Sequence, residues 1–65
     1  MKSKILIIED EAAIRRVLKK IISEENENYL VDEAEDGLIG VEMISKSDYD
    51  LVLCHSQPTA IYNTL

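Results

Sequence analysis

Three consecutive carboxylates are the first group in this sequence that could do chemistry. Glu9, Asp10 and Glu11 follow an apolar run and lead into a helical pattern. Their oxygens could share a hard cation such as Mg²⁺, which takes few protein ligands and keeps several waters. The same acids could instead cap the following helix and favour its dipole. Because runs of three acids are common, spacing alone favours the capping interpretation over a metal site.

Cys54 and His55 form a second group of chemically capable side chains. A histidine and a cysteine near Glu9 and Asp10 could build a transition-metal site, or a nucleophile with its base. The residues are few, and the simpler interpretation is that His55 is a loop residue at the end of a strand. A single cysteine excludes a disulfide within the chain.

The elements that must position these groups alternate between strands and helices. Two fully apolar runs predict strands buried on both faces, and a half-polar pattern between them predicts a strand at a sheet edge. Apolar residues recurring every three or four positions predict two helices, the second capped by Asp36. In chain order we expect a strand at 5–8, a helix at about 12–24, a strand at 29–34, a helix at about 37–46 and a strand at 51–54.

This alternation predicts the α/β class, with a parallel sheet whose connections are helices. Right-handed crossovers place the first strand in the middle, giving a three-stranded sheet of order 2-1-3 with one helix on each face. Ligands bind at the carboxyl ends of strands in such open sheets. The order therefore predicts that residues 54–55 lie near residues 9–10.

The charge balance limits the classes of partner. Thirteen acids against seven bases give a formal charge of −6, which argues against binding to nucleic acid or to anionic lipid. The bases Arg15, Arg16, Lys19 and Lys20 are interpreted as the solvated face of the first helix. The apolar run after residue 4 is too short for a signal peptide, and no run approaches the length of a membrane span, so we expect a cytoplasmic location.

Four segments form a recognisable set in their order and spacing: Lys4–Glu11, the helix start Ile14-Arg15-Arg16, Val31–Gly37 and Tyr49–Leu53. Taken together, they resemble a receiver domain of the response regulators of two-component signalling. The resemblance covers residues 2–54, about the first half of such a domain, and implies a flavodoxin-like, doubly wound fold in truncated form. We expect residues 1–55 to form a partial receiver domain and residues 56–65, which carry no charge, to form a divergent tail.

The resemblance also implies roles for single residues. The family's acidic pair falls on Glu9 and Asp10, which would hold Mg²⁺ weakly. Its phosphate-accepting aspartate falls on His55, and proline is expected where Thr59 stands, one place after Pro58. We therefore expect a receiver segment that takes no phosphate, is not an enzyme, and acts, if at all, by association.

Association follows from the physics of half a domain. The third strand would present a bare apolar edge, which favours a homodimer or larger assembly through edge pairing or tail exchange. A poorly folded monomer is the alternative. Further candidate partners are an intact regulator, or a histidine kinase that contacts Arg15, Arg16 and Lys19. The rival functions are a small metal-binding protein or enzyme built on Glu9, Asp10, Cys54 and His55, and a fragment with no function of its own.

Overall fold

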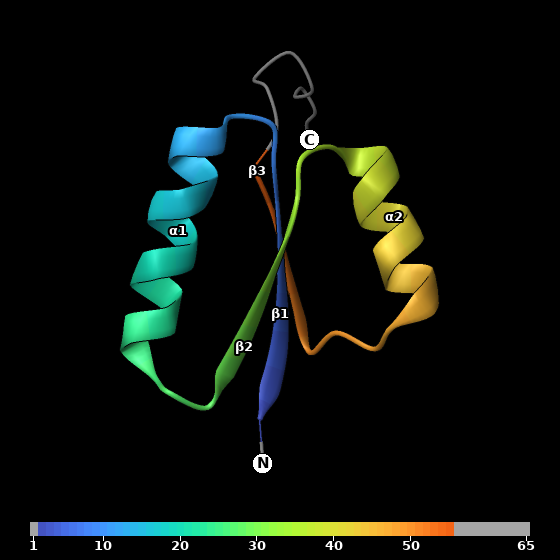
Figure 1. Ribbon diagram of the computed structural model, residues 1–65. Helices are drawn as coiled ribbons and strands as arrows, with labels where there is room; N and C mark the ends of the chain where they lie inside the picture. Colours follow the sequence, from blue (N-terminus) through green and yellow to red (C-terminus); the bar gives the residue numbers. More distant parts are fainter. Residues whose placement is uncertain (1, 56–65) are drawn as a thin grey trace, which may run out of the picture.

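The computed structural model describes residues 2–55, which fold into a parallel sheet between two helices (Figure 1). The elements in chain order are β1 (Ser3–Glu9), α1 (Ala12–Glu25), β2 (Tyr29–Ala34), α2 (Gly37–Lys46) and β3 (Leu51–His55). Both strand pairs are parallel and the order is β2-β1-β3. The predicted α/β fold, its strand order and its element positions are confirmed. The expected tail, residues 56–65, lies outside the described residues.

β1 forms the centre of the core. Leu6 and Ile7 have no exposed surface, and Ile5 and Ile8 are also buried. Because successive side chains of a strand point to opposite faces, this continuous aliphatic run needs a helix on each side. α1 covers one face of the sheet and α2 covers the other (Figure 1).

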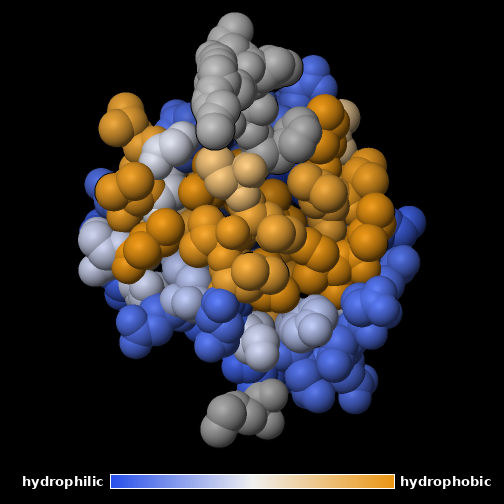
Figure 2. Space-filling view, turned by 180° about the vertical axis from the view of Figure 1, so that it is seen from behind, coloured by the Kyte–Doolittle hydropathy of each residue, from blue (hydrophilic) through white to orange (hydrophobic). Residues whose placement is uncertain are grey.

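β3 departs from the prediction of a strand buried on both faces. Leu51 is 49% exposed and Val52 is 38% exposed, because both helices pack over β1 and β2 instead of β3. A groove of about 330 Å³ lies open between α1 and this strand, lined in part by Ile21, Ile22 and Leu53. Figure 2 shows the molecule from the side opposite to that of Figure 1, and a broad apolar patch lies at the centre of this view.

The two helices begin in different ways. The Asp36 carboxylate accepts a hydrogen bond of 2.9 Å from the Ile39 N–H, so the predicted cap of α2 is present. Glu11 occupies the cap position of α1, but its side chain makes no capping hydrogen bond and no acid lies in the first turn. The interpretation of the acidic run as a side-chain cap is therefore wrong for Glu11.

Candidate functional site at the ends of beta1 and beta3

The carboxyl ends of β1 and β3 lie side by side, as the strand order requires. Cys54 pairs with Ile8, and His55 pairs with Glu9, in the parallel register of the two strands. The backbone thus brings together the residues that sequence analysis selected. Cys54 shares the α2 face of the sheet with Ile8, so strand alternation places the Glu9 side chain on the opposite face.

Glu9 and Asp10 stand at this edge in different environments. Glu9 is only 2% exposed, and its Oε2 accepts a hydrogen bond of 2.9 Å from the Glu11 N–H. Asp10, the next residue, is exposed. The buried carboxylate thus stabilises the turn that leads into α1, and the neighbouring one faces solvent.

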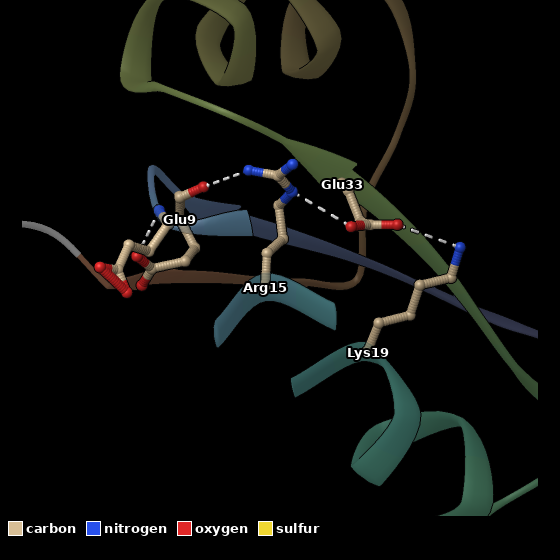
Figure 3. Close-up of polar contacts among 5 residues, drawn as sticks. Glu9, Arg15, Lys19 and Glu33 are labelled. Carbon is tan, nitrogen blue, oxygen red and sulfur yellow. Dashed lines mark hydrogen bonds and ion pairs between the residues drawn. The ribbon is translucent and has the colours of Figure 1, made fainter. Parts of the chain in front are cut away.

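Arg15 joins this turn to the edge of the sheet (Figure 3). Its Nη1 donates to the Glu9 carbonyl at 2.8 Å, and its Nε donates to Oε1 of Glu33 on β2 at 3.1 Å. Lys19 forms an ion pair of 3.2 Å with the other Glu33 oxygen. The i, i+4 spacing places Arg15 and Lys19 on one side of α1. The prediction that all four bases form a solvated face is therefore wrong for Arg15, which is only 17% exposed.

The donor chemistry of the edge suits Mg²⁺ only in part. Two carboxylates supply the oxygen ligands that this cation prefers, but one Glu9 oxygen accepts a backbone N–H. Within residues 2–55, no group of three or more histidine, cysteine or acidic residues is placed to hold a metal ion.

A second group of polar contacts involves the residues just before β3 and was missed by sequence analysis. The Tyr49 hydroxyl donates to Asp32 at 2.7 Å, and this hydrogen bond to a carboxylate raises the pKa of Tyr49 above its usual value. The Lys4 N–H donates to the Asp50 carboxylate at 2.7 Å, and the Asp50 N–H donates to the Lys4 carbonyl at 2.7 Å. Together these contacts anchor the loop before β3. Only the Tyr-Asp pair preceding an apolar run hinted at them.

A comparison with known protein families shows to which of them this chain is related. Residues 5–57 match the family described as the response regulator receiver domain. This chain belongs to that family. The match continues to residue 57, two places beyond the expected domain boundary. No solved structure gives a significant match.

Individual relatives agree with this receiver assignment. The chain is 44% identical over 52 residues to the transcriptional regulatory protein ResD of Bacillus subtilis, covering 80% of this chain and 21% of ResD. It is 40% identical over 53 residues to the chemotaxis protein CheY of Halobacterium salinarum, covering 82% of this chain and 42% of CheY. A protein-glutamate methylesterase/protein-glutamine glutaminase of Pyrococcus horikoshii is 41% identical over 51 residues, covering 78% of this chain and 14% of the enzyme. The chain thus spans less than half the length of each of these relatives.

Proposed function

We propose that this receiver segment takes part in two-component signalling by binding other proteins and does not accept phosphate. The observation that carries the proposal is the pairing of Glu9 with His55 at the ends of β1 and β3. An imidazole-bearing residue stands where the family resemblance expects the acceptor aspartate. The proposal includes no enzymatic activity, although the relative from Pyrococcus horikoshii is named as an enzyme.

The chemistry of phosphate acceptance supports this reading. An acyl phosphate forms when a carboxylate oxygen attacks phosphorus, and an imidazole is a different nucleophile. The substitution also removes an anionic oxygen from the cation site. Glu9 and Asp10 would then hold Mg²⁺ alone and weakly, because this ion gives up its waters reluctantly. Bound Mg²⁺ would supply charge neutralisation at the phosphate.

The test exposes the 65-residue protein to acetyl phosphate and Mg²⁺ and measures its intact mass. We expect no added phosphoryl group, and a phosphoryl group located at His55 would refute the proposal. Calorimetric titration with Mg²⁺ supplies an independent readout. The variant His55→Asp should bind Mg²⁺ several-fold more tightly than the natural chain. An equal affinity would show that residue 55 does not contribute to the cation site.

The side-chain contacts of the four bases on α1 support a proposal about which of them a histidine kinase would contact. Arg15 and Lys19 are engaged with Glu33, whereas Arg16 and Lys20 are exposed. We therefore place the basic contact for a kinase on Arg16 and Lys20. An intact regulator and a second copy of this chain are the other proposed partners, and both would use the apolar surface around β3.

The rival function as a small metal-binding protein or enzyme rests on the pairing of Cys54 and His55 with the end of β1. Strand alternation weighs against it, because Cys54 and Glu9 belong to opposite faces of the sheet. Titration with Zn²⁺ separates the two functions, since tight binding of one ion per chain would favour the rival. We expect no such binding.

The described residues contain no helix that is long and apolar enough to cross a membrane. A cytoplasmic location remains a prediction.

A further inference from the structure

Arg15 reaches from α1 back to the turn that follows β1 (Figure 3). Its N–H donates to the Glu11 carbonyl at 2.9 Å, so Arg15 lies one turn into the helix. Side chains of a helix tilt toward its N-terminus, and this tilt directs the guanidinium toward the end of β1. There Nη1 donates to the Glu9 carbonyl at 2.8 Å.

Two hydrogen bonds hold the peptide groups on either side of Asp10. The Glu9 carbonyl and the Asp10 N–H belong to one planar peptide group, and Arg15 holds its carbonyl oxygen. The Asp10 carbonyl and the Glu11 N–H belong to the next peptide group, and the Glu9 carboxylate holds its N–H at 2.9 Å. The soft dihedrals between these two planes are φ and ψ of Asp10. Holding both planes therefore fixes the direction in which the Asp10 side chain leaves the backbone.

Glu33 on β2 orients the guanidinium in turn. Nε of Arg15 donates to Oε1 of Glu33 at 3.1 Å, and Lys19 pairs with Oε2 at 3.2 Å. The guanidinium is a rigid planar fork, so the acceptor on Nε also sets the direction of Nη1. The Glu33 carboxylate further offsets part of the positive charge that Arg15 would place near a bound cation.

We propose that Arg15 is a positioning residue for the cation site, and that it orders Asp10 so that the carboxylates of Asp10 and Glu9 can bind Mg²⁺ together. This inference rests on the proposed function, whose weak Mg²⁺ binding it deepens by naming the group that aligns the ligands. The positive charge of Arg15 by itself disfavours a cation nearby. Charge and position therefore predict opposite effects of removing the Arg15 side chain.

The first experiment titrates the 65-residue chain with Mg²⁺ and follows the backbone amide signals of Asp10 and Glu11 by NMR, which measures weak binding. The variant Arg15→Met should raise the Mg²⁺ dissociation constant about tenfold, because contacts that orient metal ligands contribute to metal affinity. Arg16→Met is the control for charge. It removes the same charge from an exposed side chain of α1 and should leave the dissociation constant equal or lower.

Two outcomes of this titration would overturn the proposal. The first is a dissociation constant of Arg15→Met that is equal to or lower than that of the natural chain. The second is a natural chain that shows no Mg²⁺ binding at high millimolar concentration.

Two further variants separate positioning from lost stability and from charge. Asp36→Ala removes the cap of α2, on the other face of the sheet, so it destabilises the fold without a change at the turn after β1. It should keep the natural Mg²⁺ dissociation constant, and an equal rise to that of Arg15→Met would assign the effect to stability. Arg15→Lys keeps the charge but replaces the planar fork with an ammonium on a flexible stem. It should raise the constant several-fold, and a natural constant would refute the role of the fork.

The second experiment measures the order of Asp10 without a cation. NMR order parameters report the picosecond-to-nanosecond motion of each backbone amide. In Arg15→Met, the order parameter of the Asp10 amide should fall, while that of Ile7 in β1 stays at its natural value. An unchanged value at Asp10, or an equal fall at both residues, would overturn the proposal.

Circular dichroism checks that each variant folds, and Arg15→Lys carries both measurements if Arg15→Met does not fold. None of these measurements uses acetyl phosphate. Phosphorylation of His55 would refute the proposed function and leave the role of Arg15 standing, so the two failures are distinguishable.

Discussion

Replacing Gly40 with alanine should destabilise the fold, because this buried glycine allows α2 to approach the sheet. A Cβ atom built at this position would lie 2.9 Å from Cγ1 of Ile8 and closer still to its Cδ1. Ile8 belongs to the core cluster with Leu6 and Ala34. The Ile8 side chain or the helix would have to move.

Two opposing effects set the magnitude. Alanine is favoured over glycine inside a helix by about 1 kcal/mol, while inserting a carbon into a packed core costs about 1–3 kcal/mol. We expect a net loss of about 1 kcal/mol in the free energy of unfolding. For a domain of this size, that loss lowers Tm by about 4–8 °C.

The assay is urea unfolding followed by circular dichroism at one protein concentration, because association would contribute to the measured stability. Gly37→Ala is the matched control. A Cβ there meets nothing within 4 Å, so this variant should be as stable as the natural chain or up to about 1 kcal/mol more stable. Ile8→Val removes the methyl group nearest to the added Cβ. It should therefore lower the free energy of unfolding less in the Gly40→Ala variant than in the natural chain. A Gly40→Ala variant more stable than the natural chain, without coupling to Ile8, would refute the reasoning.

Three further predictions concern polar contacts and are checked by the same unfolding assay. Arg15→Met should lower the free energy of unfolding by about 1–2 kcal/mol, because it leaves the Glu9 carbonyl without its charged donor. The control Arg16→Met should change the free energy of unfolding by less than about 0.5 kcal/mol. Equal effects of the two variants would contradict the assigned contacts. Asp36→Ala should lower the free energy of unfolding by about 1 kcal/mol, because it removes the cap of α2. Glu11→Ala removes no capping hydrogen bond, so it should lower the free energy of unfolding less. The pKa of Tyr49 is raised in the folded protein, so its hydrogen bond stabilises the fold fully below the pKa of 10.0 that tyrosine has in the unfolded chain. This stabilisation is lost as the pH rises through the higher pKa of the folded protein. The natural chain should therefore lose more stability above pH 10 than Tyr49→Phe, and parallel curves would exclude this contribution.

Local patterns in the sequence were sufficient for the elements and their order. The apolar run at 5–8 predicted a strand covered on both faces, and the apolar spacing at 12–24 and 37–46 repeats at the helical period. Helical connections between strands then leave few topologies. The α2 cap was also readable, because a capping side chain and its N–H partner lie three residues apart in sequence.

Long-range contacts were the part that local patterns could not supply. Arg15 contacts Glu33 across eighteen positions, and Tyr49 contacts Asp32 across seventeen. These pairings depend on the register between strands and on how each helix lies over the sheet. The same cause explains the error about the buried third strand, since an apolar run states what a strand can bury and not where the helices lie.

The sequence by itself determined which chemical groups are available at the end of the third strand. The residue at position 55 is a histidine, so an imidazole and not a carboxylate follows the apolar run in any fold of this chain. Only the tertiary structure decided the register that pairs this residue with Glu9, the contact of Arg15 with Glu33 on the sheet, and the position of β3 at an edge of the sheet within residues 2–55. Those outcomes depend on packing between segments distant in the chain, and packing is a property of the folded whole.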